Sequence, residues 1–410
     1  MIKVIKEEDS LPIKLWLEDI EDEALEQARH LARLPFAHKW ICLMPDAHMG
    51  YGMPIGGVLA TKGIVIPNAV GVDIGCGMCF QATNIPIEIL YKETGAVGKL
   101  INGIIGSIKR NIPTGFAKHQ TRQVCSSIEA SRGDVVTTAL SRDNKPGSGL
   151  EILENAQFQI GTLGGGNHFI ELQADKEDHL CIMLHSGSRN LGKRVCEFYN
   201  NVANKLNAEW FSAIDPKWGL GFLPMNSRPG KEYLAWMDFA LRFAMENRQK
   251  MMHQCLSVVC NMIKKYDGFS DLLIEDQINI HHNYAAMENH FGENLMIHRK
   301  GATKATTSTV GIIPGSQGTS SYIVQGLGNP DSFMSCSHGA GRRMGRKEAT
   351  RTLVLADEQA KMKDIVHGMT QKEDLEEAPG AYKEIDLVLA QQADLVKIIK
   401  KLRPIASIKG

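Results

Sequence analysis

Hydrophobic residues recur at helical spacing in several long stretches of the chain. Within Glu21–Leu34 they fall on one face of a helix, and Pro35 ends the pattern. The same spacing predicts helices over Tyr233–Lys265, Lys347–Val366 and Glu384–Leu402, the last with a stripe of isoleucine, valine and leucine. Each of these helices is expected to bury one face against a core.

Shorter apolar runs between these stretches are typical of strands. Trp40–Met44 is predicted to be a short buried strand, and residues 56–75 (GGVLATKGIVIPNAVGVDIG) alternate glycine with β-branched residues, as strands joined by tight turns do. CIMLHSGS (181–188) predicts another strand, with His185 near its end. The segments mix without a regular βαβ repeat, which indicates an α+β fold of mixed β-sheets surrounded by helices. We expect a single compact domain over residues 1–410, with a variable surface insertion at about 111–158.

Composition restricts the partners that the protein can have. Lys+Arg and Asp+Glu both total 46, so no overall charge recruits nucleic acid or a membrane, and a polyanion site has to be a local patch. The N-terminus MIKVIKEEDS is charged where a signal peptide is apolar, and no run of about 18 apolar residues occurs. We therefore expect a soluble, cytoplasmic protein without a membrane partner. Nine cysteines, an odd number in a long chain, do not indicate a disulfide framework.

Six short segments place histidine, aspartate or cysteine among small or glycine residues. In chain order they are PDAHMGYG (45–52), VDIGCGM (72–78), GTLGGGNHFIE (161–171), LHSGSRNLG (184–192), INIHHNY (278–284) and CSHGAGRRMG (336–345). A single histidine of this kind is more often structural than functional, but six such segments in one chain favour a shared site. Glycine also lets backbone N–H groups approach an anion closely, as in phosphate-binding loops.

The side chains in these segments offer imidazole, carboxylate and thiolate, which suit a borderline transition metal such as manganese or zinc. The candidate ligands are Asp73, Cys76, His168, His185 and one of His281 and His282. Five ligands exceed a tetrahedral zinc site and suffice for two ions that share ligands. The basic clusters lie in RKGATK (299–304), at Arg189, Lys193 and Arg194, and in GRRMGR (341–346). They either line a groove for a phosphodiester backbone or form solvated surface. The residues alone thus indicate a metal-dependent phosphoryl-transfer site.

Two short motifs suggest other activities. Residues 265–268 (KYDG) spell K-x-D-G, the signature of lysine-nucleophile nucleotidyltransferases, but they close a predicted helix, where lysine complements the helix dipole and Asp-Gly makes a stop. Cys76 and Cys79 form a C-x-x-C without the second pair that a zinc ribbon needs and without thioredoxin-like surroundings. We expect neither motif to act in those ways.

The six segments resemble, in order, the motifs of the RtcB family of RNA ligases, from about residue 35 to the final Lys-Gly. The matching motifs are VGVDIGCGM, GTLGGGNHFIE, LHSGSR, HHNY, RKGA, IIPGSQG, GLGNP and SCSHGAGR. The resemblance implies an enzyme that uses GTP and two Mn²⁺ ions to join an RNA 3′-phosphate or 2′,3′-cyclic phosphate end to a 5′-hydroxyl end. It implies a histidine–GMP intermediate and a role in RNA repair or in tRNA splicing and processing.

The resemblance also assigns roles to individual residues. It makes His338 the nucleophile, where chemistry alone leaves Cys336 as a competitor. The implied metal ligands are Asp73, Cys76, His168, His185 and His282, with Cys76 bridging two ions. The implied nucleotide contacts are Asn167, His168, Phe169, Ile170, Glu171, His282, Asn283, Pro314, Gly315, Ser316, Gln317, Ser321, His338, Gly339, Ala340, Gly341, Tyr382 and Lys409. Glu171 is expected to accept hydrogen bonds from guanine, and Asp46 to orient the nucleophile or a metal ligand.

Two other functions are compatible with the same residues. A dinuclear metal-dependent RNA phosphoesterase would use the five ligands without His338 or GTP, and an RNA-binding scaffold would hold a structural metal without turnover. Segment 111–158 matches the family poorly, so we expect it to influence which RNA end enters.

Overall fold

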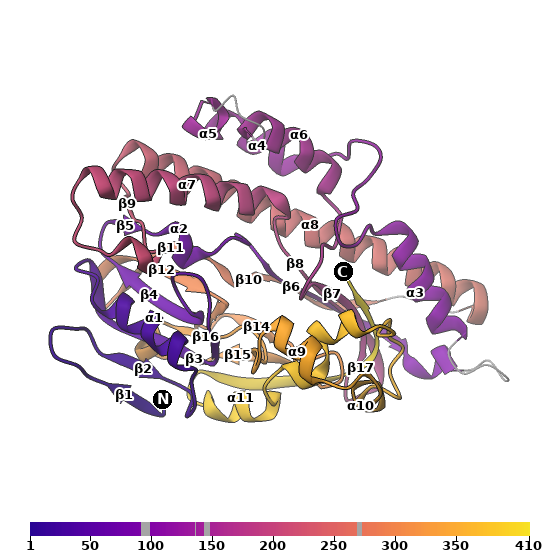
Figure 1. Cartoon of the computed structure of the whole chain (residues 1–410). Helices are drawn as coiled ribbons and strands as arrows, with labels where there is room; N and C mark the ends of the chain where they lie inside the picture. The colour runs from indigo at the N-terminus through magenta and orange to yellow at the C-terminus, as the bar shows by residue number, and fades with distance from the viewer. Residues whose placement is uncertain (92–98, 136, 143–147, 269–272) are drawn as a thin grey trace.

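Two β-sheets form the centre of the molecule in the computed structural model, which describes residues 1–91, 99–135, 137–142, 148–268 and 273–410 (Figure 1). The six-stranded sheet runs in the order β1 (Lys3–Ile5), β2 (Ile13–Leu15), β3 (Ala37–His48), β4 (Ile55–Thr61), β12 (Glu293–Lys300) and β11 (Asn283–His290). The seven-stranded sheet runs in the order β10 (Ile274–His281), β6 (Gly77–Pro86), β8 (His179–Ser186), β7 (Phe169–Ala174), β17 (Val396–Lys409), β15 (Ser321–Gly326) and β14 (Val310–Ile313). Its edge strands β10 and β14 contact each other, so this sheet is nearly closed. Two short pairs join β5 (Ile64–Val65) to β9 (Leu223–Pro224) and β13 (Ala302–Lys304) to β16 (Ser335–Ser337).

Helices cover the sheets. They are α1 (Asp22–Ala32), α2 (Pro67–Val70), α3 (Lys99–Asn111), α4 (Ser126–Val135), α5 (Ala139–Arg142), α6 (Gly149–Gln159), α7 (Asn190–Glu209), α8 (Arg228–Asp267), α9 (Arg346–Thr352), α10 (Leu355–Lys361) and α11 (Ile385–Gln391). Figure 1 shows the long helices α7 and α8 lying side by side across one face of the molecule. None of the helices in the described ranges is long and apolar enough to cross a bilayer. The prediction of a single α+β domain of mixed sheets surrounded by helices is confirmed.

The 40-residue helix α8 is the main support of the seven-stranded sheet. Its apolar face packs with α3 and with β6, β7 and β8 in one continuous core. Ser227 caps the start of the helix, where its hydroxyl accepts a hydrogen bond from the Gly230 N–H, and Gly268, in the left-handed conformation (φ +77°), caps its end. The K-x-D-G motif therefore is a helix terminus, as predicted.

The two sheets meet where β10 passes directly into β11. His282 is the one residue between these strands, which are edge strands of different sheets. Its N–H donates to the Cys76 carbonyl oxygen (2.9 Å), and its carbonyl oxygen accepts from the Ala302 N–H (3.1 Å). Because the backbone of His282 is bonded on both sides, its imidazole is fixed at the junction of the sheets.

Two predicted helices are wrong in part. The chain from Glu384 to Leu402 forms only the short helix α11 and then enters strand β17, which fills the space between β7 and β15. The hydrogen bonds to two neighbouring strands outweigh the helical periodicity of this segment. The predicted helix Lys347–Val366 is divided into α9 and α10 because Leu353 and Val354 are extended, which lets Leu353 pack on a small core around Met362.

Residues 56–75 also differ from their prediction. They form strands β4 and β5 as expected, but Pro67–Val70 is the short helix α2. Proline is favoured in a first helical turn, where its missing N–H would have no partner in any case. The strands predicted at Trp40–Met44 and at residues 181–188 correspond to β3 and β8, and the helix predicted at Glu21–Leu34 corresponds to α1.

Segment 111–158 contains α4, α5 and most of α6, together with residues 136 and 143–147, which lie outside the described ranges. Figure 1 shows these helices on the outer side of α7 and α8. Ile128, Leu140 and Leu153 are buried in a core shared with α7 and α8. The helices are thus packed onto the domain, and their variability among relatives remains a prediction.

Candidate active site at the junction of the two sheets

Four neighbouring strand ends bring the predicted metal ligands together. In the order of the sheet, His282 follows β10, Cys76 precedes β6, His185 lies near the end of β8, and His168 precedes β7. The register pairs Gly77 with Ser186 and Phe169 with His185, which brings these four positions to one edge. Strand order, rather than nearness in the sequence, therefore builds the cluster.

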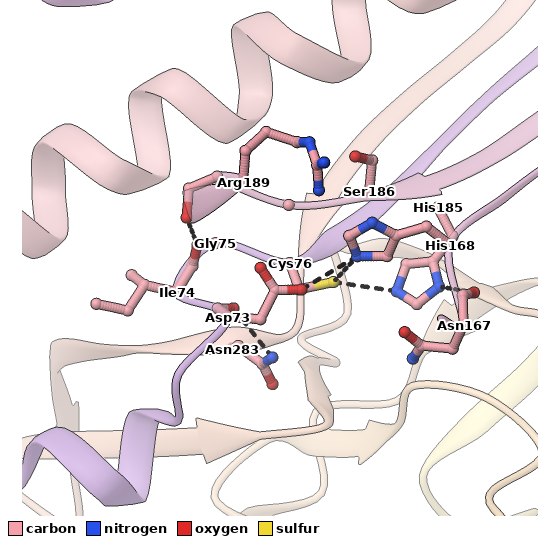
Figure 2. Close-up of polar contacts among 12 residues, drawn as sticks. Asp73, Ile74, Gly75, Cys76, Asn167, His168, His185, Ser186, Arg189 and Asn283 are labelled. Carbon is pink, nitrogen blue, oxygen red and sulfur yellow. Dashed lines mark hydrogen bonds and ion pairs between the residues drawn. The ribbon is translucent and has the colours of Figure 1, made fainter. Parts of the chain in front are cut away.

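The side chains of the cluster approach one another closely, as Figure 2 shows around Cys76. The Cys76 sulfur lies 3.2 Å from His185 Nε2 and 3.5 Å from His168 Nε2. His168 Nε2 lies 3.1 Å from the Asp73 carboxylate, and His185 Nε2 lies 3.3 Å from His282 Nε2. All five predicted metal ligands therefore form one connected group.

Backbone contacts fix which nitrogen of each ring faces this group. His168 Nδ1 donates to the Leu163 carbonyl oxygen (2.8 Å), and His185 Nδ1 donates to the Asn167 carbonyl oxygen (3.0 Å). With the proton on Nδ1, each Nε2 presents a lone pair to the cluster, as metal-bound histidines do. Cys76 can donate only one proton, whereas the imidazole lone pairs and the Asp73 carboxylate around it are all acceptors. Because the cluster has more acceptors than donors, it suits a bound cation.

Small residues create the space for this arrangement. Gly164 has φ +94°, and a Cβ there would lie 2.5 Å from His168 Nδ1. A Cβ on Gly187 would lie 2.3 Å from an oxygen of Asp73. These two glycines let the imidazole and the carboxylate approach the backbone, which explains why glycine surrounds the metal-competent residues in the sequence.

Burial gives the cluster unusual electrostatics. Burial lowers the pKa of His185 well below its usual value, and the neighbouring His168 and His338 lower it further. Burial raises the pKa of Cys76, as does the adjacent Asp73. A carboxylate and two imidazole lone pairs around a thiol are the donor set of a divalent transition metal, so these residues fit such an ion.

His338 lies on the other side of His282. Their ring centroids are 4.7 Å apart. His338 Nδ1 donates to the Asp46 carboxylate at 2.6 Å, and the His338 backbone N–H donates to the same oxygen at 3.0 Å. Asp46 is completely buried, so its carboxylate is held in place. This contact leaves Nε2 of His338 with a free lone pair.

A cavity of about 510 Å³ opens beside His338, His282 and His185. Many of the predicted nucleotide contacts line it: Asn167, Phe169, Glu171, Pro314, Gly315, Ser316, Gln317, Gly339, Ala340, Gly341, Tyr382 and Lys409. The volume lies within the range of ligand-binding pockets. Asp73, Cys76 and His168 lie behind the lining, so the cavity reaches the cluster through His185 and His282.

Comparison with known proteins assigns the chain to a family. A family model described as tRNA-splicing ligase RtcB matches residues 27–410. The chain belongs to the RtcB family. It is 36% identical, over 98% of each chain, to the RNA-splicing ligase RtcB of Escherichia coli K12. It is 31% identical to the tRNA-splicing ligase RtcB of Thermococcus kodakarensis, and the match covers 95% of this chain and 92% of that protein.

Besides His168, three of the nucleotide contacts implied by the RtcB resemblance do not line the cavity. Ile170 packs in the core beneath the seven-stranded sheet. Asn283 instead bonds the backbone on either side, donating to the Asp73 carbonyl oxygen (3.1 Å) and accepting from the Gly301 N–H (2.7 Å). Ser321 accepts from Gln173 (3.1 Å) behind the cavity wall. These side chains support the site from behind, and direct contact with a nucleotide is not supported for them.

The structure also adds residues that sequence reasoning did not assign to this RtcB site. Arg342, Arg346 and Glu377 line the cavity, and Glu377 forms ion pairs with both arginines at 3.2 Å and with Lys409 at 3.6 Å. In the sequence, Arg342 and Arg346 stand out only as part of a basic cluster. Glu377 belongs to the acidic stretch KEDLEE, which is typical of solvated surface, so no local signal marks it as buried.

One basic cluster is not placed as a groove for RNA. In RKGATK (299–304), Arg299 is buried and paired with Glu288 at 2.7 Å. Lys300 is buried and donates to the carbonyl oxygens of Tyr51, Met53 and Asn68. These two cations have intramolecular partners and brace the six-stranded sheet, so the groove interpretation is wrong for them.

Proposed function

We propose that this chain is an RNA ligase that joins RNA 3′-phosphate or 2′,3′-cyclic phosphate ends to 5′-hydroxyl ends, using GTP and two Mn²⁺ ions. The observation that carries the proposal is the placement of His338. Its ring faces the proposed metal ligand His282 across 4.7 Å, its Nδ1 bonds to a buried aspartate, and it opens on a cavity of nucleotide size. Membership of the RtcB family and the names of its relatives support the same conclusion.

In the proposed first step, Nε2 of His338 attacks the α-phosphorus of GTP. The nitrogen–phosphorus bond forms as the bond to pyrophosphate breaks, and Asp46 stabilises the positive charge that develops on the ring. GMP then passes to the RNA 3′-phosphate, and the 5′-hydroxyl displaces it. Manganese ions, held by Asp73, Cys76, His168, His185 and His282, would supply Lewis-acid stabilisation of the phosphate charge.

The test is ligation of two short RNAs by purified protein. We expect joining when the upstream RNA ends in a 3′-phosphate or a cyclic phosphate and the downstream RNA begins with a 5′-hydroxyl, with both GTP and manganese present. Omitting GTP or substituting ATP is expected to prevent joining. Joining of a 3′-hydroxyl to a 5′-phosphate, or hydrolysis of the cyclic phosphate without joining, would contradict the proposal.

Asp46 provides a more specific prediction. Asp46→Asn retains the shape of the side chain but removes the charge that selects the Nδ1-protonated form of His338. We expect the rate of GMP transfer to the protein at saturating GTP to fall by about 100-fold or more, as for the aspartate of a catalytic triad. Manganese affinity, measured by calorimetry on metal-stripped protein, should stay within about threefold, because Asp46 is not a proposed ligand. Equal loss of both would show that Asp46 acts on the fold.

Glu171 predicts how nucleotide binding depends on pH. Burial raises the pKa of Glu171 to about 7. Only the ionised carboxylate can accept hydrogen bonds from both guanine N1–H and N2–H, so binding should strengthen as pH rises through this pKa. The GTP dissociation constant should be about tenfold larger at pH 6 than at pH 8.

The matched control for this effect is Glu171→Gln, which cannot titrate. Its GTP affinity should be weaker at pH 8 and should show less change between pH 6 and pH 8, with any remaining change coming from the triphosphate itself. GTP affinity is measured by calorimetry for both proteins. If it changes with pH to the same extent in both, Glu171 does not recognise guanine.

A further inference from the structure

Arg248, in the middle of α8, is completely buried beneath the metal-ligand cluster. Within the described part of the chain, it forms no ion pair with a carboxylate, in contrast to the equally buried Arg299, which pairs with Glu288. A buried guanidinium normally requires a paired anion or a complete set of hydrogen bonds. Arg248 has only neutral hydrogen-bond partners, so their identity indicates what the residue does.

The Arg248 guanidinium contacts three separate segments of the chain. Its terminal nitrogens donate to the Gly75 carbonyl oxygen (2.8 Å) and the Ser186 carbonyl oxygen (3.0 Å) and lie 3.1 Å from His281 Nδ1, and its Nε donates to Asn279 (2.7 Å). Gly75, Ser186 and His281 are directly adjacent in the chain to Cys76, His185 and His282 respectively. One rigid planar group therefore holds the neighbours of three proposed ligands that come from three separate segments.

The loop that carries Cys76 is packed tightly against α8 at this point. A Cβ on Gly77 would lie 3.0 Å from the guanidinium carbon of Arg248, and a Cβ on Gly75 would lie 2.9 Å from the side chain of Ala244. Glycine at both positions lets the loop lie directly on the helix and the arginine. Helix α8 thus supports the loop from below, and Arg248 connects the helix to the cluster.

We propose that Arg248 is a positioning residue that sets the separation of Cys76, His185 and His282 and so prepares the cluster to bind a divalent metal ion. This inference rests on the proposed function, because it assumes that these residues are metal ligands. Nothing in the bonding of Arg248 to backbone carbonyls requires the ion, so the arginine holds the strand ends in place before metal binds.

The direction in which metal affinity changes when Arg248 is replaced shows whether the residue acts by positioning the ligands or only by its charge. Burial lowers the pKa of Arg248 to about 10, so the residue remains a cation at neutral pH. A cation near the site repels a divalent ion, so removal of the charge alone would tighten metal binding. If Arg248 acts by position, its removal weakens metal binding in spite of that repulsion.

The experiment is a titration of metal-stripped protein with Co²⁺, followed by absorption spectroscopy. Co²⁺ reports both affinity and, through its d–d and thiolate charge-transfer bands, the coordination geometry. Arg248→Met is expected to weaken Co²⁺ binding by about 10-fold to 100-fold and to change the spectrum, as when groups that orient metal ligands are removed. Arg248→Lys retains the charge but cannot reach all the acceptors, and an effect in the same direction is expected. Unchanged or tighter binding in folded Arg248→Met would overturn the proposal.

Two further variants guard against a loss of fold. Val259→Ala removes a buried side chain of α8 about three turns away, so it should lower the thermal unfolding temperature without changing the Co²⁺ spectrum. If Arg248→Met does not fold, Asn279→Ala replaces it, since this change removes one anchor of the arginine and should weaken Co²⁺ binding by a few fold. Unchanged binding in both Arg248→Lys and Asn279→Ala would then overturn the proposal. Absence of Co²⁺ binding in the wild type would instead contradict the proposed metal centre.

Discussion

His338→Ala is expected to abolish transfer of label from α-labelled GTP to the protein, with a fall in rate of at least about 1,000-fold. The proposed intermediate is a bond between the His338 imidazole and the GMP phosphorus, and alanine offers no nucleophile. In the wild type, label should remain on the protein through denaturing electrophoresis, survive alkali and be released by acid, as a phosphoramidate is. GTP binding should persist in the variant, because Glu171 and the other cavity residues are unchanged.

Cys336→Ala is the matched control for His338→Ala. Cys336 lies two residues away and is the competing nucleophile from chemistry alone, but it is buried in the core beside β3 and β12. Burial raises the pKa of Cys336 to about 12, so the thiolate is scarce at neutral pH. We expect this variant to be labelled at close to the wild-type rate. Labelling of the His338 variant but not of the Cys336 variant would reverse the assignment.

The same pair of variants separates ligation from the other two functions. A phosphoesterase with this metal site would hydrolyse cyclic phosphate ends equally well with and without His338, and would take no label from GTP. A scaffold with a structural metal would bind RNA in both variants and turn over in neither. The ligase proposal alone requires label on the wild type and its loss in His338→Ala.

Most of the candidate site could be predicted because its chemistry is local in the sequence. The backbone at Gly164 lies against His168, and the backbone at Gly187 lies against Asp73. Glycine in these segments therefore marks the positions around which the cluster forms. The sequence alone could not place the five proposed ligands close together. That depends on the order β10, β6, β8 and β7 in the sheet and on the passage of the chain between sheets at His282.

The errors in the predicted fold come from contacts between distant segments. Val396–Lys409 carries apolar residues that suit either a helix or a strand, and its state is decided by β7 and β15, which precede it by many residues. The same reason hides Arg248 and Glu377. Arg248 is a charged residue within a predicted amphipathic helix and Glu377 lies in an acidic stretch, and each is buried because partners from other segments meet it.

Cys76→Ala is expected to weaken manganese binding to the metal-stripped protein by at least about 100-fold and to remove ligation. The Cys76 sulfur is the centre of the cluster, since it lies 3.2 Å from His185 Nε2 and 3.5 Å from His168 Nε2. Alanine would leave the two rings and the Asp73 carboxylate without the ligand that connects them. Calorimetric titration with Mn²⁺ measures the affinity, and the ligation assay measures the activity.

The control is Cys79→Ala, which removes the other thiol of the C-x-x-C. Cys79 is buried in the core between α8 and the seven-stranded sheet, and burial raises its pKa to about 11. Its loss should cost about 1 kcal/mol of stability through the cavity left behind while manganese affinity is retained. Cys76 directly precedes β6 and Cys79 lies within it, so a difference between the two variants reflects their positions rather than damage to β6. Equal loss of manganese affinity in both variants would indicate disruption of the strand, and full affinity in Cys76→Ala would remove this thiol from the metal centre.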